Sequence, residues 1–207
     1  MQSIVVNGFT HNYQSIIKGI PDINIVAICG CGGGFSGPAY LYDNIMTNPF
    51  DNFTFTRIDI AYPYDKDAIY SSKLHFNQSV DVVVTISRLI YAENNKPIVL
   101  IGWSMGGAVV IETGYKLQKE IKVRGIITIS SQSAHIKNLK NLNSDIYKLF
   151  IHGDKDLVLN DKISKYLYEQ VNTRKMLQII KDGDHFLSGN EKYLYELVKN
   201  VIASMEL

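Results

Sequence analysis

The chain has 207 residues, 46% of them hydrophobic and 20% charged, which suits one compact folded unit with a sizeable core. Its formal net charge is +1 with both signs scattered, so the composition favours neither a nucleic-acid partner nor an anionic membrane surface. No apolar run approaches the roughly 20 residues of a membrane span, and no basic segment followed by an apolar run begins the sequence, so we expect a soluble, cytoplasmic protein.

Strand and helix signals alternate along the first half of the chain. The turn-forming pair Asn7-Gly8 lies among β-prone residues and predicts an N-terminal hairpin within residues 3–20. Apolar runs predict strands at 23–29, 53–60 and 98–102, the first of them buried on both faces. Helical signals predict helices at 38–46, at 74–93 and from the third strand to about residue 119.

The second half of the chain repeats this alternation. Strands are predicted at 123–129, 146–151 and 175–180, and helices at 135–142, at 161–171 and after residue 188. The last helix opens with Ser188-Gly189-Asn190-Glu191, which has the form of a capping box. The alternation predicts a doubly wound, mostly parallel α/β sheet covered by helices on both faces. In such sheets the ligand site lies beyond the carboxyl ends of the strands.

The pentapeptide Gly102-Trp103-Ser104-Met105-Gly106 interrupts two apolar runs. A strand pattern precedes it and a helix pattern follows it, so the serine falls on a sharp strand-to-helix turn of the kind called a nucleophile elbow. The two glycines suit this turn because the strand end and the helix start come close together. A glycine-flanked turn with an idle serine is the alternative. The pentapeptide in this context resembles the elbow of esterases in the α/β-hydrolase family.

This resemblance extends from about residue 23 to residue 207 and implies the family's fold. Many members insert a cap of several dozen residues before the strand that carries the acid, whereas residues 130–145 leave room for one short helix. We therefore expect residues 1–207 to form a single α/β-hydrolase domain of a minimal form without a cap domain.

The resemblance also implies a catalytic triad in the order serine, acid, histidine. The segment from His152 to Val158 resembles the family's acid loop and assigns the acid to Asp156. The usual proline after the valine is missing, so Asp154 remains a competitor. Either aspartate could instead cap the helix that follows.

The residue in the family's histidine position is His185, which follows the last predicted strand and precedes the last helix. Four other histidines compete with it. His11 lies too early to stand at a strand end, His75 and His135 open predicted helices and are expected to face solvent, and His152 is expected to structure the acid loop.

Attack on a carbonyl places negative charge on its oxygen, which requires two fixed hydrogen-bond donors. The resemblance assigns them to the backbone N–H groups of Met105 and Cys31, with Gly30 and Gly32 as alternatives to Cys31. A dinucleotide-binding loop is a rival interpretation of residues 30–37, but Phe35 breaks the required glycine spacing.

The two cysteines allow other roles to be considered on their spacing. Cys29 and Cys31 stand two positions apart, which is poor geometry for a mutual disulfide, and a zinc site would need two further ligands at the usual spacing. Cys31 as a thiol nucleophile is a further alternative to Ser104. We expect no disulfide and no metal site.

The resemblance implies a serine hydrolase that cleaves a small-molecule acyl ester or thioester through an acyl-enzyme, without a cofactor. Carboxylesterase, lysophospholipase and acyl thioesterase activities all fit the sequence. Phe35, Tyr62 and Trp103 would border the substrate groove, or they pack as ordinary core and rim residues. The alternative function is a catalytically silent hydrolase fold that binds a ligand or protein. The sequence carries no signal for an oligomeric state.

Overall fold

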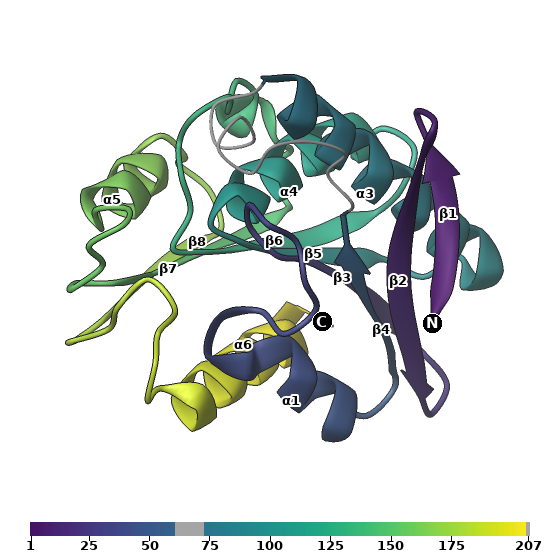
Figure 1. The fold of residues 1–207 in the computed structure, drawn as a ribbon, viewed down its shortest axis with the longest axis horizontal. Coiled ribbons are helices and arrows are strands. Elements are labelled where there is room, and N and C mark those ends of the chain that lie inside the picture. The colour runs from purple at the N-terminus through teal and green to yellow at the C-terminus, as the bar shows by residue number, and fades with distance from the viewer. Residues whose placement is uncertain (61–72, 206–207) are drawn as a thin grey trace.

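The computed structural model describes residues 1–60 and 73–205, and within them eight strands form one sheet (Figure 1). Their order across the sheet is β1-β2-β4-β3-β5-β6-β7-β8. The strands are β1 (Gln2–Val6), β2 (Phe9–Lys18), β3 (Ile23–Ile28), β4 (Phe53–Asp59), β5 (Ile98–Trp103), β6 (Val123–Ile129), β7 (Tyr147–Gly153) and β8 (Lys175–Ile180). All strands from β3 to β8 pair in parallel, whereas β1 with β2 and β2 with β4 are antiparallel.

The N-terminal hairpin predicted around Asn7-Gly8 is confirmed as β1 and β2. Both turn residues have positive φ, 53° at Asn7 and 83° at Gly8, which is the conformation that a two-residue hairpin turn requires. Through the pairing of β2 with β4, the hairpin extends the parallel sheet by two antiparallel strands.

Helices cover both faces of the sheet, as Figure 1 shows. One face carries α3 (Lys73–Asn94), α4 (Met105–Leu117) and α5 (Lys162–Glu169), and the other carries α1 (Leu41–Thr47) and α6 (Glu191–Met205). Every residue of β3 is buried because the strand lies between these two helical layers. The predicted doubly wound, mostly parallel sheet with helices on both faces is therefore confirmed. No helix in the described part of the chain is long and apolar enough to cross a membrane.

The helix predicted at 135–142 is wrong. Residues 130–146 connect β6 to β7 and contain only a single 3-10 turn at Leu139–Asn141. His135 has a φ of 67°, which is incompatible with a right-handed helix at that position. The Glu112 side chain on α4 holds the segment instead: its Oε1 accepts hydrogen bonds from the backbone N–H groups of Lys137 and Asn138, at 2.6 and 2.8 Å. These bonds attach the connection to α4 as an irregular segment.

The predicted capping box of α6 is only half present. Glu191 Oε1 accepts a hydrogen bond from the Gly189 N–H at 2.9 Å, as the glutamate of such a box does for a residue before the helix. Ser188 Oγ, however, donates to Asp184 Oδ2 at 2.9 Å rather than capping the helix. Asp184 competes for this hydroxyl because it lies four residues earlier, on the loop after β8.

The helix predicted at 38–46 is divided in two. A 3-10 turn at Pro38–Tyr40 precedes α1, with positive φ at Ala39 (47°) and Tyr40 (52°). The Ala39 N–H donates to the Phe186 carbonyl at 2.7 Å, so the kink connects the start of α1 to the loop after β8.

Candidate active site

Ser104 lies on a tight turn between β5 and α4. Its backbone has φ 57° and ψ −122°, an unfavourable combination for a residue with a side chain and the conformation of a nucleophile elbow. A Cβ at Gly102 would lie 2.1 Å from the Gly106 carbonyl oxygen, so the strand end does meet the helix start. A Cβ at Gly106 would lie 2.6 Å from the Cys29 carbonyl oxygen, so a side chain there would collide with the end of the neighbouring strand β3.

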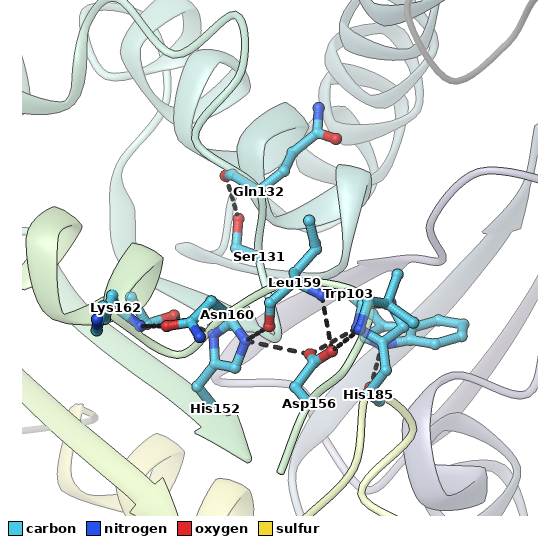
Figure 2. Close-up of polar contacts among 11 residues, drawn as sticks. Trp103, Ser131, Gln132, His152, Asp156, Leu159, Asn160, Lys162 and His185 are labelled. Atoms are coloured by element: carbon cyan, nitrogen blue, oxygen red, sulfur yellow. Dashed lines mark hydrogen bonds and ion pairs between the residues drawn. The ribbon is translucent and has the colours of Figure 1, made fainter. Parts of the chain in front are cut away.

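Asp156 is buried on the loop after β7, and every carboxylate oxygen has hydrogen-bond partners. Its Oδ1 accepts from the backbone N–H groups of Val158 and Leu159, both at 2.8 Å. Its Oδ2 lies 2.7 Å from His185 Nδ1 and 3.1 Å from His152 Nε2, and Figure 2 shows the two imidazoles on either side of the carboxylate. Such a set of donors stabilises a buried negative charge.

His152 is held inside the acid loop. Its Nε2 lies 2.9 Å from the Leu159 carbonyl oxygen, which can only accept, so this nitrogen carries a hydrogen. In the neutral ring Nδ1 then accepts from the Ser164 hydroxyl, 2.7 Å away. Both nitrogens are thus engaged, in agreement with the expectation that His152 structures this loop.

Asp154 has a different hydrogen-bond partner from Asp156. It is exposed, and its Oδ1 accepts a hydrogen bond from the Asp182 N–H at 2.7 Å. This bond joins the loop after β7 to the loop after β8. The same two loops cross closely at Gly153, where a Cβ would lie 2.1 Å from the Gly183 carbonyl oxygen. Of the two competing aspartates, only Asp156 is hydrogen-bonded to His185.

Trp103 connects His185 to the Ser104 turn. The Trp103 indole N–H donates to the His185 carbonyl at 3.0 Å, and the two ring centroids are 5.4 Å apart (Figure 2). The structure therefore brings Asp156 to His185 directly and His185 to the residue before Ser104. Ser104 Oγ and His185, both described, share no direct hydrogen bond in this conformation, and such bonds are often loose in an enzyme without substrate.

The remaining histidines lie outside this cluster. His11 is buried in β2. The expectation that His75 opens a helix is confirmed, but the expectation that it faces solvent is wrong, and His135 neither opens a helix nor is fully exposed. His75 is buried in the first turn of α3, and His135 lies half-buried in the β6–β7 connection with its ring 5.2 Å from that of Phe76. The β6–β7 connection thus packs against the start of α3.

The glycine-rich loop after β3, residues 30–37, lies against Ser104. A Cβ at Gly30 would be 2.7 Å from the Ser104 Cβ, and Cys31 Sγ lies 3.4 Å from Met105 Sδ. The two residues expected to supply oxyanion donors are therefore adjacent. Burial raises the pKa of the Cys29 thiol to about 12 and also raises the pKa of Cys31. Both thiols stay protonated at neutral pH, which argues against a cysteine nucleophile.

A recess of about 360 Å³ lies between the glycine-rich loop and the loop after β8. Phe35 and Trp103, two of the residues expected at the substrate groove, line it, while the third, Tyr62, lies outside the described residues. Tyr40 and Phe186 also line it and were missed by the sequence analysis. The position of Phe186 directly after His185 was an available signal, whereas Tyr40 reaches the recess only through the kink before α1.

A larger hollow of about 590 Å³ lies at the sheet edge, lined by β2 and the second half of α3 and remote from Asp156 and His185. Among the described residues, no three His, Cys, Asp or Glu side chains are placed to hold a metal ion together.

Comparisons with known proteins agree with this fold. Residues 31–199 match the model of a family described as Phospholipase/Carboxylesterase. Curated protein sequences give no match. Est1E from Butyrivibrio proteoclasticus is a similar solved structure, with a TM-score of 0.77 and 13% identity over 99% of this chain and 98% of that one.

Two further solved structures are similar at low identity. A serine hydrolase without a lid from Xanthomonas campestris has a TM-score of 0.76 and 12% identity, covering 98% of this chain and 93% of that one. An α-β serine hydrolase homologue from Coxiella burnetii has a TM-score of 0.75 and 16% identity, covering 97% and 96%. These likenesses show the fold, and the family match spans well over half of the chain. The chain belongs to the phospholipase/carboxylesterase family of α/β-hydrolase-fold serine hydrolases.

Proposed function

We propose that the protein cleaves carboxylic esters or thioesters through an acyl-enzyme, with Ser104 as nucleophile, His185 as general base and Asp156 as the acid that orients it. The observation that carries this proposal is the buried 2.7 Å hydrogen bond between His185 Nδ1 and Asp156 Oδ2, beside the strained Ser104 turn. Asp156 is buried and hydrogen-bonded to His185, whereas Asp154 is exposed and bonded to the Asp182 N–H, and this difference supports Asp156 as the acid.

The hydrogen bond to Asp156 requires a proton on His185 Nδ1, so in the neutral ring Nε2 keeps its lone pair. Nε2 takes the Ser104 proton as Oγ attacks the substrate carbonyl, and the carboxylate stabilises the imidazolium that forms. His185 then gives the proton to the leaving alcohol or thiol as the carbonyl–oxygen or carbonyl–sulfur bond breaks. A water molecule releases the acyl group by the same steps, and its proton returns to Ser104 through His185.

The oxyanion of each tetrahedral intermediate needs donors that are already in place. Met105 offers its backbone N–H at the start of α4, where the helix dipole also favours negative charge. The Cys31 N–H is the proposed second donor, with Gly30 and Gly32 kept as alternatives. The contact between the Cys31 and Met105 side chains supports donors converging from the glycine-rich loop and the start of α4.

The recess beside Trp103 is the proposed site of the substrate's acyl or leaving group. Its aromatic walls suit apolar and aryl groups, and its volume of about 360 Å³ limits their size. Est1E has been solved with ferulic acid bound, so esters of aromatic acids join esters and thioesters of alkyl acids in a substrate panel. That panel separates the carboxylesterase, lysophospholipase and thioesterase alternatives.

Labelling by a fluorophosphonate probe tests the proposal. We expect the folded protein to be labelled, heat-denatured protein and Ser104→Ala to remain unlabelled, and Ser133→Ala, which changes an exposed serine on the β6–β7 connection, to label normally. Ester turnover should follow the same pattern. Labelling of Ser104→Ala would remove the assigned nucleophile, and a folded wild-type protein without labelling or turnover would favour the catalytically silent alternative.

A further inference from the structure

The glycine-rich loop, residues 30–37, has few internal means of holding its shape. Gly32, Gly33 and Gly34 all have positive φ, at 94°, 70° and 95°. A Cβ at Gly32 or Gly34 would meet no atom within 4 Å, so neither position is packed. Glycine has the largest backbone freedom of any residue. A loop of this composition needs contacts from elsewhere to keep one conformation.

Asp59, the last residue of β4, supplies the first such contact. Its Oδ1 accepts a hydrogen bond from the Gly34 N–H at 2.6 Å. A Cβ at Gly33 would lie 2.4 Å from the same oxygen, so the carboxylate occupies the space beside two consecutive loop residues. Asp59 thereby fixes the middle of the loop to the sheet.

Arg57, two residues earlier on the same strand, supplies the second contact. Its Nη1 donates to the Phe35 carbonyl at 3.1 Å, and its guanidinium lies 5.2 Å from the centre of the Phe35 ring. Gln14 accepts from Nε and Nη2 at 3.0 and 2.7 Å, and Asp43 on α1 pairs with Nη1. With only 12% of its side chain exposed, Arg57 is held from several directions.

The ionisation of Asp43 fits this arrangement. Burial raises the pKa of its carboxyl, but hydrogen bonds from Arg57 and Ser36 outweigh this effect and leave the pKa below its usual value. Asp43 is therefore charged at neutral pH, and because Ser36 is itself a loop residue, the pair links the loop, β4 and α1.

We propose that Arg57 and Asp59 are positioning residues, which hold the loop so that the Cys31 N–H stays fixed beside Ser104. The inference rests on the proposed function. Neither side chain needs to touch the substrate. Because an oxyanion donor acts mainly in the transition state, a loosened loop should lower kcat much more than it raises KM.

Kinetics of Asp59→Ala and Asp59→Asn, together with Asp81→Ala, test the proposal. We expect Asp59→Ala to lower kcat by about tenfold or more, less than the roughly 10²- to 10³-fold known for complete loss of one oxyanion donor, with KM nearly unchanged. Affinity for a boronic acid transition-state analogue should fall in parallel. Asp59→Asn retains an oxygen acceptor and should lose clearly less activity. Asp81→Ala removes an aspartate from a surface ion pair with Lys116 and is the matched control.

A second pair of variants examines the arginine. Arg57→Lys keeps a positive charge near Asp43 but cannot serve Phe35 and Gln14 at once, so it should also lower kcat. Arg88→Lys, in an exposed ion pair with Glu120, is its control. Thermal unfolding of every variant separates loss of fold from loss of loop position.

Hydrogen exchange of the peptide covering residues 30–37 gives a readout that does not depend on activity. Exchange there should accelerate in Asp59→Ala and Arg57→Lys and stay unchanged in both controls. Unchanged exchange in this peptide, or an equal loss of activity in Asp59→Asn and Asp59→Ala, would overturn the positioning role. A wild-type protein that neither turns over esters nor takes the fluorophosphonate label would refute the proposed function instead, and with it the catalytic purpose of positioning by Arg57 and Asp59.

Discussion

At the scale of single residues, the candidate site depends on one carboxylate that holds two imidazoles. Asp156 Oδ2 contacts both His152 and His185, while Oδ1 is occupied by backbone donors. The carboxylate cannot turn without breaking several hydrogen bonds at once, so His185 is oriented by a rigid partner. The resemblance to the family's acid loop pointed to Asp156 but left Asp154 as a competitor, and the side-chain contacts that distinguish the two could not be predicted from the sequence.

We expect Asp156→Asn to lower kcat by about 10³- to 10⁴-fold, because an amide cannot stabilise the imidazolium and favours the wrong imidazole tautomer. Asp154→Asn keeps an oxygen that can accept from the Asp182 N–H and should change turnover little. Initial rates on a soluble ester, with circular dichroism to verify folding, measure both. The reverse ranking would assign the acid to Asp154.

At the scale of elements, the alternation of strands and helices was predictable because apolar runs and turn residues mark it locally. The strands at 123–129 and 175–180 have the predicted boundaries. The contacts of Arg57 and Asp59 with the glycine-rich loop were not predictable, since they depend on β4 pairing beside β3. The helix wrongly predicted at 135–142 has a similar origin, because the backbone of His135 and the hydrogen bonds of this segment to Glu112 on α4 are set by tertiary contacts.

Glu112→Ala should therefore lower the free energy of unfolding by about 1–3 kcal/mol, since it removes a charged acceptor from two backbone N–H groups. Glu112→Gln keeps one oxygen acceptor and should cost less. Chemical denaturation of the two variants and wild type measures the difference. Glu120→Ala, on an exposed ion pair, is the control and should change stability by less than about 1 kcal/mol. Equal stability of Glu112→Ala and wild type would show that the connection holds its conformation without this residue.

At the scale of the whole molecule, the proposed site lies beyond the carboxyl ends of the parallel strands. The loops after β3, β5, β7 and β8 supply the glycine-rich loop, Ser104, Asp156 and His185, and two separate hydrophobic cores keep the sheet between its helical layers. Residues far apart in sequence meet because parallel strands end at the same edge. This convergence was predictable from the order of elements, whereas the size and walls of the recess were not, because Tyr40 and Phe186 come from a kink and a loop.

The short β6–β7 connection determines the last prediction, which concerns substrate handling. An enzyme activated at a lipid surface needs a mobile segment that opens, and residues 130–146 are held by Glu112 and contain a single 3-10 turn. We therefore expect hydrolysis of a short-chain ester to saturate normally below its solubility limit, with no jump in rate when an emulsion forms.

Chain-length preference follows from the same geometry. Each further methylene adds about 0.8 kcal/mol of binding only where a wall can bury it, and a recess of about 360 Å³ offers limited wall. Short and medium acyl chains should therefore react best in a series of esters that share one leaving group. A sharp rise in rate at the emulsion point, or a strong preference for long chains, would contradict this prediction.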